Sequence, residues 1–415
     1  MTIALADWHD ILTVLRESYQ IWSPGLRKDE YHEYIWRQIN HPWARRNYKF
    51  FVLKHNSQVV ASCKLYTVNL TYRGRSYLFG GIGAIYSMKA VRGCGYGREI
   101  VTEIVDYCFN NDYDGTILFS DIDPEFYDRL GFTEFGSADF SVHLPKQQVA
   151  VEFSSSDSAG GPCSSGSNGS GGSAGSAGSI GSAGSAGSAG SAGSAGSAGS
   201  IGSAGSIGSA GMTGSAVFTD GTDMTGIASA ATATPDVNYV NDTDVPTMIA
   251  IYSKWQRSQP FAYQRSELYL QYKLGRERYL AEHSTLAWPK LEITYAVENG
   301  IQTGYALTER GGKNLRILEI VGTESARHQL WNTLVENAIQ QSMHKLRGWE
   351  SVVSDLYPSF RLDGVIDDAV KKCRHFPPLT STQRTWGRPM YMPFETELEK
   401  LVDYFPCPIL ELDHL

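Results

Sequence analysis

The chain has 415 residues, of which 42% are hydrophobic, and its formal net charge is −8. This length suits two or three domains, and the negative charge without a basic cluster argues against a nucleic-acid partner. The six cysteines form no CxxC pair, and neither a run of 18 apolar residues nor a signal-peptide pattern occurs, so we expect a cytoplasmic protein without metal or membrane contact.

The first 145 residues alternate between helical and strand patterns. Apolar residues on one face predict helices over about 7–19 and 28–40, and turn residues at 55–57 divide a strand pair. Glycines then separate a strand from an amphipathic helix. In chain order after the two helices, we expect two strands within 50–70, a strand at 76–88 and a helix from about 98. A strand at 115–122, a short helix at 124–131 and further strand over 132–144 follow.

The glycine segment reads RGCGYGRE, from Arg92 to Glu99. A strand that ends in glycines and opens into a helix gathers unpaired backbone N–H groups and the positive end of the helix dipole, which favours a phosphate. A plain turn without a ligand is the alternative. A dinucleotide fingerprint is disfavoured because Arg98 stands where its third small residue belongs.

Two motifs carry a resemblance to the GNAT N-acetyltransferase superfamily. Arg92 to Gly97 is similar to the family's Q/R-x-x-G-x-G/A signature, and Phe126 to Phe132, FYDRLGF, is similar to its second landmark. The resemblance covers residues 1 to about 145. It implies a mixed central α/β sheet flanked by helices and acetyl-CoA as co-substrate.

The resemblance also implies roles for particular residues. The strand end Ile85-Tyr86-Ser87 would pair with the pantetheine amides. Tyr127 would be the general acid that protonates the leaving thiolate. The pyrophosphate would lie on the loop and first helical turn, comprising Arg92, Gly93, Cys94, Gly95, Tyr96, Gly97 and Arg98.

Two features of the acceptor side stay open. Family members often carry Asn seven residues before the landmark tyrosine, and here that position is Ser120, so its usual contact toward the cofactor is in question. Asp121, Asp123 and Glu125 are equal candidates for the general base. They belong to an acidic stretch that would attract a cationic amine, either a small molecule or a protein lysine, although solvated surface charge explains such a stretch as well.

A low-complexity segment divides the chain. Glycine falls at every third position from Gly172 to Gly214, without the proline that collagen needs, so a disordered Gly/Ser/Ala linker is expected. We therefore expect three regions: a GNAT-like acetyltransferase domain over 1–150, the linker over 151–235 and a second domain over 236–415.

The second domain repeats the first more faintly. An Asn-Gly turn divides the strand pair in 293–310, a strand and helix follow in 314–341, and 384–394 is the expected closing strand. Only Gly322 stands where the first half has three glycines, so we expect a degenerate GNAT-like domain without cofactor. Such tandems resemble the enhanced-intracellular-survival group.

The favoured function is an acetyl-CoA-dependent N-acetyltransferase in which an acceptor amine attacks the thioester directly. A non-catalytic acetyl-CoA-sensing or interaction protein is the alternative, and the width of the acyl pocket is open. The acceptor and the oligomeric state cannot be read from the sequence.

Overall fold

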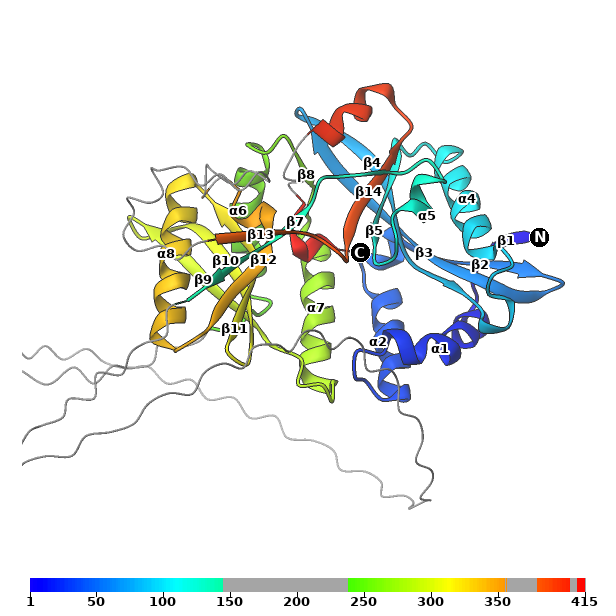
Figure 1. Ribbon diagram of the computed structural model, residues 1–415, viewed down its shortest axis with the longest axis horizontal. Coiled ribbons are helices and arrows are strands. Elements are labelled where there is room, and N and C mark those ends of the chain that lie inside the picture. The colour runs from blue at the N-terminus through cyan, green and yellow to red at the C-terminus, as the bar shows by residue number, and fades with distance from the viewer. Residues whose placement is uncertain (145–237, 355, 357–378, 404–408, 415) are drawn as a thin grey trace, which may run out of the picture. The chain divides into compact units, whose positions relative to one another are not determined.

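The computed structural model describes residues 1–144, 238–354, 356, 379–403 and 409–414. The expected linker over 151–235 lies outside these residues. The two flanking parts of the chain form one compact unit of helices packed on two sheets (Figure 1). The helices are α1 (Trp8–Trp22), α2 (Lys28–Asn40), α3 (Ala44–Asn47), α4 (Tyr96–Phe109), α5 (Glu125–Asp128), α6 (Val245–Gln256), α7 (Glu267–His283) and α8 (Glu324–Gln340).

The first sheet has the order β1-β2-β3-β4-β5-β14-β6, and β8 pairs with β3 at one end. Strands β4 and β5 pair in parallel, whereas β4 pairs with β3, and β5 with β14, in antiparallel orientation. Helix α4 connects the parallel strands and packs on β3 and β4. The strands are β1 (Thr2–Leu5), β2 (Tyr48–His55), β3 (Gln58–Tyr72), β4 (Arg75–Ser87), β5 (Gly115–Ser120), β6 (Thr133–Glu134), β8 (Phe261–Tyr263) and β14 (Arg388–Pro393).

The second sheet repeats this plan in the order β13-β7-β12-β11-β10-β9. Its parallel pair is β11–β12, connected by α8 as β4 and β5 are connected by α4. Two copies of one mixed α/β arrangement are therefore present, as the sequence predicts. The strands are β7 (Ala138–His143), β9 (Leu291–Glu298), β10 (Ile301–Gly311), β11 (Asn314–Gly322), β12 (Lys345–Trp349) and β13 (Leu379–Gln383).

The two halves exchange strands. β7 pairs with β12 and β13 in the second sheet, while β14 pairs with β5 and β6 in the first (Figure 1). The expectation that 384–394 closes the second sheet is therefore wrong, because its alternating pattern fits the edge of β5 as well as any other. Sequence periodicity gives a strand but not its partner.

Local chemistry explains the turns of both meanders. Asn56 and Ser57 have φ of 48° and 64°, which lets β2 return directly into β3 through a two-residue turn. Asn299 and Gly300 have φ of 52° and 76° between β9 and β10. The predicted turns at these two places are confirmed.

The core joins the halves more closely than the sequence suggests. On one face of the first sheet, α4 packs with the strands and with Tyr127. On the other face, α1 and α2 share one apolar cluster with residues from α7, β8 and β14. Trp43 contacts the rings of Tyr269 and Tyr272, with centroids 5.1 and 4.8 Å away.

Candidate active site

The strands β4 and β5 form a fork in the first sheet. They pair from Phe79–Gly115 to Ile82–Leu118 and then separate. At the separation β4 contains a bulge opposite β3, and Ala84 there has φ of 47°, a conformation that costs energy for a residue with a side chain. Beyond the bulge, Ile85 to Ser87 have no strand partner on the β5 side among the described residues, so their backbone groups can bind a ligand.

The glycine loop lies beside this fork. Gly93 and Gly95 have φ of 82° and 88°, and a side chain added at either would meet nothing within 4 Å. Gly95 is the N-cap of α4 and offers no capping side chain. The first backbone N–H groups of α4, from Tyr96 to Arg98, therefore have no partner within the helix. An open backbone surface with positive helix polarity fits a pyrophosphate.

The arginines of the loop differ in their surroundings. Arg92 lies over the Tyr86 ring, and its guanidinium donates to the Tyr86 hydroxyl at 3.3 Å and to the Ser87 carbonyl at 3.3 Å. Arg98 and Cys94 are exposed. The Tyr86 side chain is buried against Trp22, so only its backbone faces the fork. Arg92 must leave these contacts to reach a phosphate.

Tyr127 lies at the end of α5, on the other arm of the fork. Its ring is buried against Phe126 and Phe132. Burial, together with the nearby thiol of Cys63 and carboxylate of Asp121, raises the pKa of Tyr127, so the phenol keeps its proton at neutral pH. A protonated hydroxyl on a pocket wall is able to serve as a proton donor.

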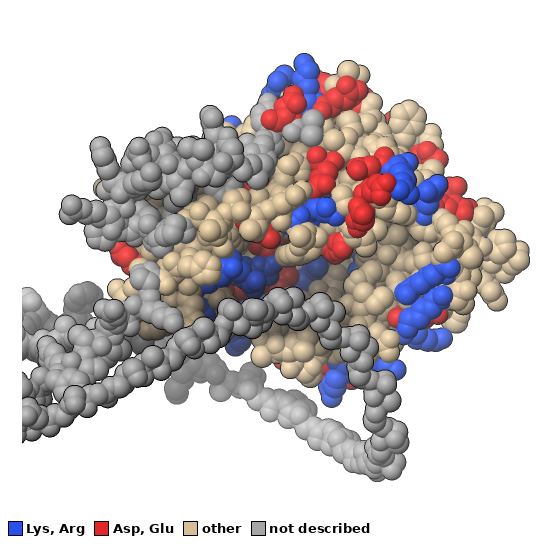
Figure 2. Space-filling model, viewed as in Figure 1, with Lys and Arg blue, Asp and Glu red and all other residues tan. Residues whose placement is uncertain are grey.

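A cavity of about 810 Å³ adjoins the fork and reaches α2, α7 and the last described residues of the chain. Ile85 and Tyr127 line it, which brings two of the predicted site residues together. The recess in the middle of the face drawn in Figure 2 contains side chains of both charge signs. The aromatic lining residues are Trp22, Tyr31, Tyr34, Tyr66, Phe119, Tyr127, Trp288 and Trp386, and the charged ones are Lys64, Asp121, Lys273, Arg276, Glu277, Glu309, Arg316 and Glu411.

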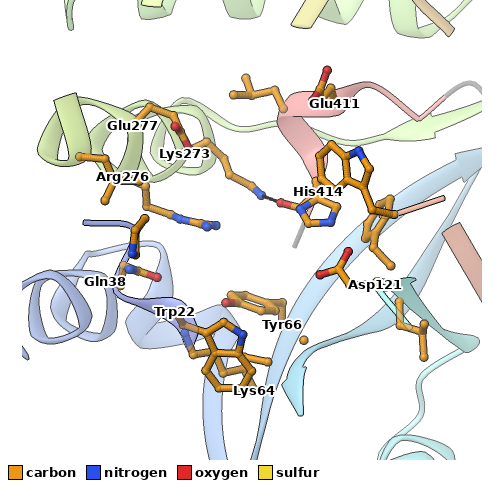
Figure 3. A pocket seen from close by; sticks show the side chains of 18 of the residues that line it. Trp22, Gln38, Lys64, Tyr66, Asp121, Lys273, Arg276, Glu277, Glu411 and His414 are labelled. Atoms are coloured by element: carbon orange, nitrogen blue, oxygen red, sulfur yellow. Dashed lines mark hydrogen bonds between the residues drawn. The ribbon is translucent and has the colours of Figure 1, made fainter. Parts of the chain in front are cut away.

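The segment 409–414 enters this cavity and is held by a buried ion network. Arg265 pairs with Glu319 and with Asp413, each at 2.8 Å, and the three side chains are at most 1% exposed. Lys273 Nζ donates to the carbonyl of His414 at 2.6 Å (Figure 3). Burial and then neighbouring cations lower the pKa of His414 to about 3, so its imidazole is neutral.

Only one of the three candidate bases lines the cavity. Asp121 does, and its Oδ1 accepts a hydrogen bond from the Gly387 amide at 2.9 Å. Asp123 accepts from the Glu125 amide, and Glu125 pairs with Arg129 on the surface. These two carboxylates are exposed and serve local contacts.

Ser120 does not face the fork as the usual asparagine would. Its hydroxyl donates to the Ile122 carbonyl at 2.8 Å and accepts from the Ile122 amide. The side chain thus shapes the turn after β5, and its contact toward a cofactor is replaced by local bonds.

The corresponding fork of the second sheet is filled from within. Strands β11 and β12 pair as far as Ile317–Gly348, and beyond that point the Arg327 guanidinium donates to the carbonyls of Ile320 and Val352 at 3.0 and 2.9 Å. Gly322 packs against Gly304, whose Cα is 2.6 Å from an added side-chain carbon. A pantetheine chain would have to displace this buried arginine.

Sequence reasoning missed the basic side chains of the cavity. Lys64 interrupts the apolar run of β3, which is a signal that was available. Arg276 and Lys273 lie on α7, whose pattern does not show that it packs across the first sheet.

Among the described residues, no His, Cys, Asp and Glu cluster has the arrangement of a metal site, and no helix is long and apolar enough to span a membrane.

A forked parallel pair, a glycine loop at a helix start and a tyrosine on a shared cavity form the arrangement that the resemblance to GNAT acyltransferases implies. Residues 2–135 match the family model described as acetyltransferase (GNAT) domain. The predictions of a GNAT domain and of an enzyme of the N-acetyltransferase type are confirmed by this match.

Solved structures share the fold over most of the chain. A probable N-acyltransferase from Enterococcus faecalis has a TM-score of 0.55 at 10% identity, with 94% of this chain and 72% of that chain covered. A GCN5-related N-acetyltransferase from Anabaena variabilis has a TM-score of 0.54 at 12% identity, with 95% and 73% covered. Eis1 from Mycobacterium abscessus has a TM-score of 0.49 at 10% identity, with 97% of this chain and 76% of that chain covered. No curated protein matches the sequence significantly.

Proposed function

We propose that the chain is an acetyl-CoA-dependent N-acetyltransferase whose chemistry takes place in the fork of the first sheet. One observation carries the proposal: the open glycine loop and the Tyr127 hydroxyl flank the same fork, and this fork opens into a large cavity. The loop 92–98 would hold the pyrophosphate, and the free edge of Ile85 to Ser87 would hold the pantetheine amides.

The acceptor would enter from the cavity. Its amine nitrogen attacks the thioester carbonyl carbon, a C–N bond forms and the C–S bond breaks, so an amide and coenzyme A result. The amine loses one proton to a base and the thiolate sulfur gains one from Tyr127. Asp121 is the proposed base, because it alone of the three candidates lines the cavity.

The second sheet would have no donor site of its own. Its fork holds Arg327, which is 3% exposed, and Gly322 has no space beside it. We propose that this half instead walls the acceptor cavity with residues from α7 and from 409–414, as the lining of the cavity supports.

Thermal unfolding of the full chain with and without acetyl-CoA tests the donor site. Ligand at about 100 times its dissociation constant adds roughly 2.7 kcal/mol to the free energy of unfolding. Gly95→Trp would abolish the shift because the indole fills the loop. Gly74→Trp is the matched control, since Gly74 also has positive φ and open space. An equal shift in both variants would contradict the site.

Turnover then separates the enzyme from a sensor. Release of coenzyme A that depends on an added amine supports transfer, whereas binding of acetyl-CoA without turnover of any amine would favour the sensing alternative. Propionyl-CoA and longer donors, assayed in the same way, test the choice of acetyl.

A further inference from the structure

Among the described residues, only one of the four Lys and Arg side chains that line the cavity has a carboxylate partner. Arg316 pairs with Glu309 at 3.1 Å and with Glu411, and Lys273 donates to the His414 carbonyl. Arg276 and Lys64 have no carboxylate within 4.0 Å in the described part of the chain. A partly buried cation without an anion costs free energy, so this pair needs an explanation.

Arg276 extends from α7 into the cavity (Figure 3). Its guanidinium lies 3.5 Å from the Tyr34 hydroxyl, measured from Nε, and 6.0 Å from the Tyr272 ring, and the carboxylate of Glu277 acts on it only from a longer distance. The buried amide Nε2 of Gln38, on the same wall, makes no hydrogen bond of normal geometry. This wall therefore contains one buried donor without a partner among the described residues.

Lys64 lies on β3 opposite Gly83, beside the fork. Burial, and then the positive charge of Arg276, lowers the pKa of Lys64 to about 7. The two cations are thus close enough to repel each other. A negative group bound between them would relieve that repulsion.

The carboxylates of the cavity do not meet this need. Glu309 and Glu411 are held by Arg316, and Glu277 accepts from the Trp288 indole at 3.1 Å. Glu277 is next to Arg276 on α7 but makes no ion pair with it within 4.0 Å, and Asp121 lies beside Tyr127 on the far side from Arg276 (Figure 3).

We propose that the acceptor is an amine that also carries an anionic group, a carboxylate or phosphate, and that this group binds to Arg276, with Lys64 on the side nearer the fork. The amine would then face Asp121 and Tyr127 at the fork, with its apolar middle between the aromatic walls. The proposal rests on the proposed acetyltransferase function and names its acceptor class.

Matched amines with the full chain test the preference. Benzylamine is compared with para-(aminomethyl)benzoate, and tyramine with its phosphate monoester, so that each pair differs in the anionic group alone and the two pairs distinguish carboxylate from phosphate. We expect the anionic member of at least one pair to have kcat/KM about 10-fold or more higher, the value of a charge-assisted bond. Equal or lower values in both pairs would overturn the proposal.

Variants connect the preference to the two cations. Arg276→Met and Lys64→Met should each lower the ratio of kcat/KM between anionic and neutral acceptors about 10- to 100-fold, chiefly through KM. Arg278→Met is the control, because Arg278 lies on the same helix but pairs with Asp242 outside the cavity. An unchanged ratio in both cavity variants, or a loss in kcat alone, would overturn the role of these residues.

The same assays distinguish failure of this proposal from failure of the proposed function. If acetyl-CoA binds and neutral amines are acetylated as well as anionic ones, the acceptor class is wrong and the enzyme remains. If acetyl-CoA neither binds nor is consumed with any amine, the function itself is wrong.

Discussion

Met390 of β14 lies directly opposite Leu118 of β5, and both side chains are at most 1% exposed. This pairing places a strand from the last part of the chain inside the first sheet, between β5 and the short edge strand β6. In return, β7 from the first half lies between β12 and β13. Neither sheet is complete without the other half of the chain.

The exchange predicts that residues 1–150 do not fold stably alone. Without β14, the edge of β5 and the apolar side chains beneath it are exposed. We expect the fragment to aggregate or to unfold without cooperativity in a circular dichroism melt. Coexpression with residues 236–415 should restore a complex that copurifies, because both exchanged strands are then present. A fragment that melts as sharply as the full chain would contradict this reading.

Tyr127 provides a prediction about the chemical step. Tyr127→Phe removes the proposed proton donor but keeps the ring in its aromatic cluster, so kcat should fall about 10²- to 10⁴-fold. The shift in melting temperature on adding acetyl-CoA should be preserved. Because burial raises the pKa of Tyr127, its loss of a proton should not limit activity anywhere between pH 6 and 9.

Tyr107→Phe is the control for that variant, since Tyr107 lies on α4 against Phe51 and does not line the cavity. Similar kcat values for the two variants would remove Tyr127 from the mechanism.

Lys64 predicts a pH dependence of stability. Its pKa is about 7 in the folded protein and near 10.4 when unfolded, so the unfolded chain binds more protons between these values. The cost of the buried ammonium is therefore full below pH 7 and is relieved as the pH rises toward 10. Lys64→Met should stabilise the protein by about 1–3 kcal/mol at pH 6.5 and by less at pH 9, measured by urea unfolding. A difference that grows with pH would refute the assignment.

The sequence was sufficient for the parts of the site that depend on local chemistry. The glycine loop could be predicted because positive φ and close approach of a ligand require glycine at Gly93 and Gly95. The motif FYDRLGF likewise identified Tyr127 as a candidate site residue on the short helix after β5. Asn-Gly and Asn-Ser turns likewise mark the hairpins.

The missing parts depend on pairing between distant segments. Nothing in 384–394 shows that its strand joins β5, and nothing on α7 shows that Arg276 enters a cavity beside Lys64. The acidic stretch suggested a cationic acceptor, yet of the three candidate bases only Asp121 lines the cavity. Fold partners and cavity walls are set by tertiary packing, which periodicity does not encode.

Arg265 is expected to anchor the segment 409–414 in the cavity through its two buried ion pairs. Arg265→Ala leaves the carboxylates of Glu319 and Asp413 buried without their partner, which should cost about 3–5 kcal/mol in urea unfolding. Acceptor KM should rise as well, because Glu411 and His414 line the cavity. Arg37→Ala is the control, since both side chains of its pair with Glu33 are exposed and its loss should change little. If Arg265→Ala were as stable as this control, the buried network would not be what anchors the segment.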